Sequence, residues 1–204
     1  MSSGSDKRSP VRAKVREAVS EAILDAAEDV ALENGLEAAS AAAIAARAGV
    51  AVGTLYNYFP DRDGILAALF KSRRAEIVPA IEAAAAAGAG LAFEERLRAY
   101  VRRLLELFEA HINFLRLAIQ AEGEGAKIKG RDKTTLMNQV LHHIEQIMRD
   151  GASRKLFPVS RVPAYARMLQ GALKALVHWR VADGGSLAQD GDLTTDLFLR
   201  GMST

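Results

Sequence analysis

The chain has 204 residues, half of them hydrophobic and a quarter charged, which suffices for one or two folded domains and excludes a disordered chain. It contains no cysteine, which excludes a disulfide framework, a thiolate metal site and a cysteine nucleophile. The net charge of +2 is too small to indicate nucleic-acid binding by itself, so an argument for DNA has to come from the local arrangement of residues.

The N-terminal end is polar and basic. Residues 1–11 are rich in serine, glycine, proline and charge, so we expect a disordered arm there and no signal peptide. Residues 7–16 hold five basic side chains and no acidic one, which suits either a solubilising tail or an arm that enters a DNA groove. No segment approaches the ~18 consecutive apolar residues of a membrane span, so we expect no membrane partner and a cytoplasmic protein.

The spacing of apolar residues predicts helices along the whole chain and no convincing strand. Glycine and proline mark most of the helix ends, because glycine takes the left-handed cap and the residue before a proline leaves the helical region. The predicted fold class is therefore all-α, with about nine helices. They span residues 15–34, 41–48, 52–59, 61–87, 93–108, 112–119, 136–148, 160–183 and 193–199.

Single residues set several of these helix ends. Ser40 and Ser160 each precede a predicted helix, and a serine hydroxyl there accepts a free amide proton of the first turn. Gly151 is expected to end the helix that begins at residue 136. Residues 122–133 (EGEGAKIKGRDK) are expected to form a loop.

The most informative segment covers residues 40–59, SAAAIAARAGVAVGTLYNYF. Two short helices with a glycine between them are typical of a helix-turn-helix, in which Gly49 makes a left-handed turn and Ala45 lets the helices approach. The second helix can then enter the major groove of DNA. Exposed Tyr56 and Asn57 on so short a helix favour this interpretation over a helical hairpin within an all-α core.

This segment resembles the TetR family of bacterial transcriptional regulators. The resemblance begins at residues 23–27 (ILDAA), is strongest over residues 44–50 (IAARAGV) and 53–60 (GTLYNYFP), and fades after about Phe70. Beyond that point only the number and order of helices match. The resemblance implies a helix-turn-helix domain followed by a helical domain for ligand binding and dimerisation.

The resemblance also implies which residues meet DNA. Hydroxyl groups can donate to phosphate oxygens and asparagine can pair with adenine, so the residue types suit these roles. Ala51 departs from the serine or threonine that often caps the recognition helix, and Val52 replaces a residue that is commonly basic or polar. Arg62 stands where lysine is frequent and keeps a charge for clamping phosphate. The expected DNA contacts are Ser40, Ala51, Val52, Gly53, Thr54, Tyr56, Asn57, Tyr58 and Arg62.

The region after residue 60 predicts a helical bundle with a bulky apolar interior, and the resemblance implies that it holds an unidentified small-molecule effector. Pockets and cores share a composition, so for any single side chain the core assignment is favoured. The candidate pocket residues are Tyr100, Leu104, Phe108, Phe114, Leu117, Met137, Leu141, Tyr165, Met168 and Ala172.

The last two predicted helices resemble the pair that forms the dimer in this family. Two copies would make an apolar four-helix interface and hold two recognition helices about 34–36 Å apart, the spacing of successive major-groove turns. The candidate interface residues are Leu173, Leu176, His178, Trp179, Leu197 and Phe198.

The sequence indicates neither a catalytic nor a metal site, and no cofactor. His142 and His143 are adjacent and point ~100° apart on a helix, so they do not converge on one ion. His142 and Glu145 lie three residues apart, but a third ligand is not apparent. Neither a nucleophile elbow nor a phosphate-binding glycine loop is present, so we do not expect an enzyme.

These patterns predict a homodimeric regulator that binds a palindromic double-stranded operator and leaves it when a small molecule binds. A repressor is favoured, and an activator is also consistent with the sequence. The predicted divisions are a disordered basic arm (1–11), a helix-turn-helix domain (12–60) and a ligand-binding and dimerisation domain (61–204). The alternative is a helical carrier or enzyme of the same fold without DNA binding, which Ala51 and Val52 keep open.

Overall fold

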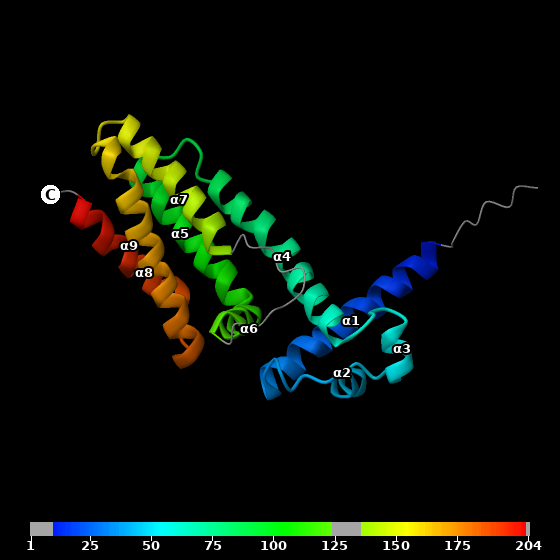
Figure 1. The fold of residues 1–204 in the computed structure, drawn as a ribbon. Helices are drawn as coiled ribbons and strands as arrows, with labels where there is room; N and C mark the ends of the chain where they lie inside the picture. Colours follow the sequence, from blue (N-terminus) through cyan, green and yellow to red (C-terminus); the bar gives the residue numbers. More distant parts are fainter. Residues whose placement is uncertain (1–9, 124–135, 203–204) are drawn as a thin grey trace, which may run out of the picture. The chain divides into compact units, whose positions relative to one another are not determined.

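The structure is a computed structural model that describes residues 10–123 and 136–202. Across these residues it contains nine α-helices, one 3₁₀ turn and no strand, which confirms the all-α class and the predicted number of helices (Figure 1). The helices are α1 (Pro10–Asn34), α2 (Ala41–Arg47), α3 (Val52–Tyr56), α4 (Arg62–Ala86), α5 (Phe93–Ala110), α6 (Ile112–Gly123), α7 (Leu136–Ser153), α8 (Val162–Asp183) and α9 (Leu187–Met202).

The chain divides into two compact units. The first contains residues up to Lys71 together with the segment that begins at Gln120, and the second contains the rest. By packing, the first unit therefore includes the start of α4, which the sequence-based division at residue 60 assigned to the second domain. No described helix has the length and apolar character needed to cross a membrane.

The first unit is built on α1, which packs against α2, while α2 packs against α3. Its centre consists of aliphatic side chains with no exposed surface, and burial of each leucine or isoleucine among them contributes roughly 1.5–3 kcal/mol. They come from α1, α2, α3 and the start of α4, so the core fixes α3 as well as α1. These side chains are Ile23, Ala27, Ala31, Ile44, Leu55, Ile65 and Leu69.

Helix α1 begins earlier than the sequence predicted. Pro10 and Val11 are helical, so the expectation that they belong to a disordered arm is wrong. Proline favours the first turn of a helix because its φ angle is already set and its missing N–H has no partner there in any case. The other residues of that predicted arm, 1–9, lie outside the described residues.

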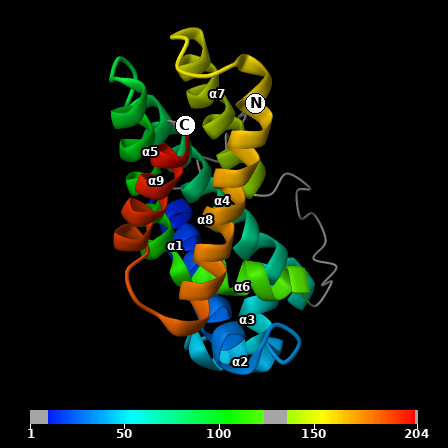
Figure 2. The ribbon, with the colours of Figure 1, turned by 90° about the vertical axis from the view of Figure 1, so that its left-hand side faces the viewer.

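The second unit is a bundle in which α5 packs on α9, α7 packs on α8, and α8 and α9 contact each other (Figure 2). The predicted apolar stripe of α5 is buried as expected, from Leu97 to Phe108. Gly191 of α9 lies so close to Leu105 of α5 that a Cβ atom at this position would overlap the leucine side chain. A glycine therefore allows the two helices to pack closely.

Several helix ends differ from the prediction for physical reasons. Helix α7 continues through Gly151 to Ser153, because this glycine makes room for the rings of Phe93 and Phe157 and does not take a cap conformation. Ser160 does not cap α8: it lies in the 3₁₀ turn Val159–Arg161, and Arg161 precedes the helix without a side-chain cap bond.

Three further boundaries differ. Helix α9 starts at Leu187, six residues before the predicted start, and α3 ends at Tyr56, three residues before the predicted end. Helix α6 extends to Gly123, so the first residues of the predicted loop 122–133 are helical. The remainder of that loop lies outside the described residues.

Candidate nucleic-acid interface and interior site

Helices α2 and α3 form the predicted helix-turn-helix. The Ser40 hydroxyl accepts a hydrogen bond from the backbone N–H of Ala43 at 3.2 Å, which confirms the predicted N-cap of α2. Gly49 has a φ angle of 68°, a left-handed conformation that other residues adopt only with strain, so the turn requires glycine here. Leu55 is fully buried and anchors α3 to the core.

The outer face of α3 is free of intramolecular cover. Val52 is 40% exposed and Tyr56 is 48% exposed, and Gly53 has open space where a Cβ atom would stand. Asn57, directly after the helix, is also exposed. Ala51, the N-cap residue of α3, makes no side-chain hydrogen bond to the first turn, because a methyl group has no acceptor atom. This face of α3 can therefore approach another molecule closely.

A contact that the sequence did not reveal holds the end of α3. The Arg16 guanidinium of α1 lies over the Tyr58 ring, 5.1 Å from its centroid, and donates a hydrogen bond to the carbonyl oxygen of Asn57 at 3.3 Å. The sequence places Arg16 only within the basic N-terminal stretch. Its separation of 41 residues from Asn57 left no local pattern by which the pairing could be found.

Arg62 has a different role from the one expected. Its Nε atom donates to the carbonyl oxygen of Ala39 at 2.8 Å, its Nη2 atom donates to the carbonyl oxygen of Leu36, and its Nη1 atom lies 3.3 Å from Asp63. These contacts tie the start of α4 to the connection between α1 and α2. The structure thus gives this guanidinium internal partners, and its contact with a phosphate stays a prediction.

Arg47 at the end of α2 pairs with two acidic residues of α1. Its Nη1 atom lies 3.2 Å from Asp29 Oδ2, and its Nη2 atom contacts Glu33. These carboxylates raise the pKa of Arg47, chiefly through the hydrogen bond from Arg47 to Glu33. Part of the acidic charge of α1 is thereby neutralised by α2.

The predicted pocket residues separate into three groups in the second unit. Those of α5 and α6 are buried: Tyr100, Leu104, Phe108, Phe114 and Leu117. Three are half-buried: Met137, Leu141 and Tyr165. Met168 and Ala172 are exposed on the outer face of α8, so their assignment to an interior pocket is wrong.

Tyr165 belongs to an aromatic cluster at the edge of the bundle. Its ring stands edge-on to Phe157 and Phe198, with centroids 5.3 and 6.1 Å away. Its hydroxyl accepts a hydrogen bond from Arg161 at 3.2 Å. The phenol oxygen of Tyr165 is thus already used by a neighbour one turn away, unlike that of Tyr100.

Four buried polar atoms in the second unit have no hydrogen-bond partner among the residues that the structure describes: Arg96 Nε and Tyr100 Oη of α5, and His143 Nδ1 and Asp150 Oδ2 of α7. Arg96 and Asp150 form an ion pair with each other. The other two atoms belong to the rings of Tyr100 and His143, which lie 6.2 Å apart. Burial raises the pKa of Tyr100 and lowers the pKa of His143. The sequence indicated Tyr100 as a pocket residue, whereas it offered no sign that His143 rather than His142 faces inward.

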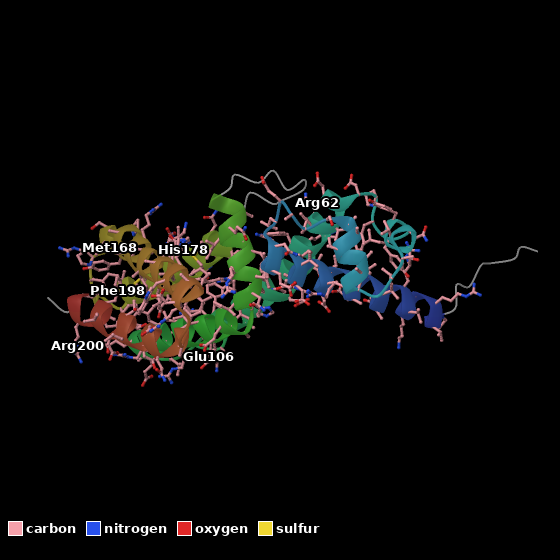
Figure 3. All side chains as sticks on the ribbon, turned by 90° about the horizontal axis from the view of Figure 1, so that it is seen from below. Arg62, Glu106, Met168, His178, Phe198 and Arg200 are labelled. Atoms are coloured by element: carbon pink, nitrogen blue, oxygen red, sulfur yellow. The ribbon has the colours of Figure 1, made fainter. Side chains whose placement is uncertain are left out.

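Helices α8 and α9 present large apolar side chains on their outer surface. Four of them are roughly half to two-thirds exposed: Met168 at 64%, Trp179 at 49%, Leu193 at 60% and Leu197 at 63%. His178 is exposed and Phe198 is half-buried on the same pair of helices (Figure 3).

Two of the predicted interface residues lie elsewhere. Leu173 is fully buried and Leu176 is 8% exposed, so both belong to the core of the unit, and their assignment to an outer interface is wrong.

No three histidine, aspartate or glutamate side chains within the described ranges are grouped to hold a metal ion. His142 pairs with Gln146 at 2.9 Å, and Glu145 forms ion pairs with Arg149 and Arg167. The two residues of the weak metal pattern therefore have other partners.

The comparison with protein families decides what the first unit is. The sequence profile of "Bacterial regulatory proteins, tetR family" matches residues 23–69, which run from the middle of α1 through α2 and α3 into α4. This part of the chain matches the N-terminal domain of TetR-family regulators. The chain is a DNA-binding transcriptional regulator, with the helix-turn-helix at α2 and α3.

Solved structures share the fold of the chain. FadR from Bacillus subtilis, solved in complex with stearoyl-CoA, is 25% identical with a TM-score of 0.70, over 89% of this chain and 98% of that one. The TetR-family regulator PfmR from Thermus thermophilus is 23% identical with a TM-score of 0.71, over 87% and 97%. The fatty acid degradation regulator FadR from Bacillus halodurans is 23% identical with a TM-score of 0.65, over 89% and 98%. No curated protein matches the chain.

Proposed function

We propose that the chain is a homodimeric repressor that binds a palindromic operator through α3 and is released when a small molecule binds in the second unit. The observation that carries this proposal is the exposed outer face of α3, held in place by the fully buried Leu55. A repressor of this kind acts in the cytoplasm, because it binds chromosomal DNA.

The residues proposed to contact DNA lie on and beside α3. Val52 and Tyr56 are the exposed side chains of the helix, and Val52 suits a thymine methyl group in the major groove. Asn57 can pair with an adenine edge, while the hydroxyls of Thr54 and Tyr58 suit phosphate oxygens. The backbone of Ala51 and Gly53 and the hydroxyl of Ser40 complete the proposed set.

The proposed dimer uses the outer surface of α8 and α9. Met168 and Trp179 are eleven residues apart, which is about three helical turns, so they lie on one side of α8. Leu193 and Leu197 are one turn apart on α9, and α8 contacts α9. An apolar surface of this kind suits a second copy of the same chain, with His178 and Phe198 beside it.

The proposed ligand response is a shift between two conformations of the dimer. Helix α4 contributes residues to both units, so it links them covalently. A ligand that favours the conformation with lower operator affinity must itself bind less tightly when operator is present, since linkage is reciprocal. That FadR from Bacillus subtilis was solved with stearoyl-CoA supports a small-molecule site in a chain of this fold.

Selection from a pool of random DNA duplexes tests the proposal. We expect a palindromic consensus, and an affinity that falls linearly with salt on a logarithmic scale, with a slope of about −0.9 per phosphate contacted. Failure to enrich any duplex at low salt would instead favour the carrier or enzyme of the same fold.

A further inference from the structure

The interior of the second unit contains an unusual pair of polar groups on neighbouring helices. Tyr100 of α5 is 1% exposed, and its hydroxyl has no hydrogen-bond partner among the described residues. The Nδ1 atom of His143 on α7 is also buried and also has no hydrogen-bond partner among the described residues. Helix α7 packs on α5. The centroids of the two rings are 6.2 Å apart, so the two residues are close neighbours in the bundle.

The surroundings of this pair are apolar. Leu97 and Leu104 lie one turn to either side of Tyr100, and Val140 and Ile147 lie about one turn to either side of His143. All four are at most 1% exposed. A buried donor or acceptor without a partner costs roughly 1–3 kcal/mol, and most buried polar groups in proteins avoid this cost. Two such groups on neighbouring helices therefore indicate that a third, external group completes the hydrogen bonds.

The charges near the pair show which group fits. Burial keeps the His143 ring neutral by lowering its pKa and keeps the Tyr100 hydroxyl protonated by raising its pKa. Besides burial, a side-chain hydrogen bond with Gln146 of α7 raises the pKa of His143, the neighbouring His142 lowers it, and the carboxylate of Glu82 on α4 raises it. A ligand carboxylate would be buried near Glu82 and beside two neutral rings, which is unfavourable.

Arg96, which lies one turn from Tyr100, does not make the site favourable for a ligand carboxylate. Arg96 of α5 forms an ion pair with Asp150 of α7, with 3.7 Å between Nη1 and Oδ2. Arg154 lies 3.2 Å from the same carboxylate oxygen. Asp150 thus faces two guanidinium groups, of which that of Arg154 is 45% exposed. Together with Glu82, the two carboxylates balance the two positive charges.

We propose that Tyr100 and His143 bind the uncharged oxygen of an otherwise apolar effector, such as an alcohol or a ketone. The Tyr100 hydroxyl donates to that oxygen. The Nδ1 atom of His143 accepts the proton of a bound alcohol, or donates to a bound carbonyl in its other tautomer. This inference rests on the proposed effector site and names the class of molecule that the site selects.

The test uses the full-length protein and four ten-carbon probes that differ only in the polar group: 1-decanol, 2-decanone, decanoate and decylamine. Binding is measured by competition for a fluorescent apolar probe at pH 7. We expect 1-decanol and 2-decanone to bind at least 10-fold more tightly than decanoate and decylamine. Equal or tighter binding of decanoate would overturn the inference, and so would a failure of all four probes to bind.

Matched variants locate the bound oxygen. Tyr100→Phe keeps the ring and removes the hydroxyl, and we expect it to weaken 1-decanol binding about 5- to 10-fold, as loss of one hydrogen bond implies. His143→Leu should do the same, whereas His143→Asn, which keeps a polar atom near the Nδ1 position, should retain most of the affinity. Unchanged binding in Tyr100→Phe would show that the alcohol lies elsewhere.

Two controls separate this inference from the proposed function and from misfolding. His142→Leu removes the neighbouring, exposed histidine of α7, so 1-decanol binding should be unchanged. The melting temperature of Tyr100→Phe without ligand should not fall, because the hydroxyl it removes has no partner among the described residues. Binding to the selected DNA duplex without any probe is measured in parallel, so loss of DNA binding and loss of alcohol binding are distinguishable.

Discussion

At the scale of single residues, the exposed end of α3 determines whether DNA is read. Tyr56 is 48% exposed and Asn57 is exposed, so neither side chain contributes much to the core. We predict that Tyr56→Ala combined with Asn57→Ala lowers affinity for the selected duplex at least 100-fold, since good base contacts are worth about 1–3 kcal/mol each. Fluorescence anisotropy at fixed salt measures the loss.

The melting temperature of this double variant should match that of the unmodified protein, which separates lost recognition from lost folding. Val159→Ala is the matched control, because Val159 is 72% exposed and lies in the second unit. Operator affinity that survives the double substitution would contradict the assignment of α3 as the recognition helix.

The sequence predicts that Arg62 contacts a DNA phosphate, whereas in the structure its guanidinium donates hydrogen bonds to backbone carbonyl oxygens. Arg62→Gln removes the donors to the carbonyl oxygens of Leu36 and Ala39, so we predict a loss of about 1–3 kcal/mol in the free energy of unfolding, measured by urea titration. The salt slope of DNA binding should not change. A slope reduced by about 0.9 would instead show that Arg62 neutralises a phosphate.

The sequence predicted the role of a residue correctly where that role depends on residues within one helical turn. It did not predict the role where contacts with distant parts of the chain determine it. The Ser40 cap and the buried Leu55 follow from neighbours within one turn. The inward position of Leu173 and the outward position of Met168 depend on the rotation of α8 about its axis. Packing against α7 and α9 sets that rotation, and an alanine-rich helix with apolar residues on several sides does not reveal it.

At the scale of elements, Gly151 shows why α7 continues where the sequence predicted an end. A Cβ atom at this position would lie 2.7 Å from the Phe93 ring and 3.0 Å from the Phe157 ring. We predict that Gly151→Ala lowers the free energy of unfolding by about 1–3 kcal/mol through overpacking, although alanine favours helices by roughly 1 kcal/mol over glycine. Chemical denaturation followed by circular dichroism measures the change.

Gly201 is the matched control for this substitution. It lies in the last turn of α9 with no atom within 4 Å of a Cβ position, so Gly201→Ala should not destabilise the chain. An equally stable Gly151→Ala variant would contradict the close packing of α7 against the two rings.

The early start of α9 has a related explanation. The sequence-based prediction began this helix at residue 193, after the polar residues Gln189 to Asp192. In the structure Asp190 pairs with Arg180 at 2.5 Å and Asp192 pairs with Arg102 at 2.8 Å. These partners lie on α8 and α5, so the polar residues are held by tertiary contacts that a single-sequence pattern does not contain.

At the scale of the whole molecule, the outer surface of α8 and α9 links oligomeric state to DNA binding. Leu193 and Leu197 are 60% and 63% exposed in the single chain, a large apolar surface for a helix that faces water. We predict that Leu193→Asp combined with Leu197→Asp converts a dimer to a monomer in sedimentation velocity. Charges buried at the centre of an apolar interface are unfavourable, and a two-fold axis places each of them in the interface twice.

The same variant should bind a selected palindromic duplex far more weakly while binding to one half-site is unchanged. A dimer that places two recognition helices on two half-sites binds roughly 10²- to 10⁴-fold more tightly than a monomer on one half-site. The monomeric variant loses this gain in affinity. Val159→Asp is the control, since Val159 is 72% exposed but lies in the turn before α8. A double variant that stays dimeric would show that a different surface joins the two copies, and a monomer with full affinity for the palindrome would show that one copy reads the operator alone.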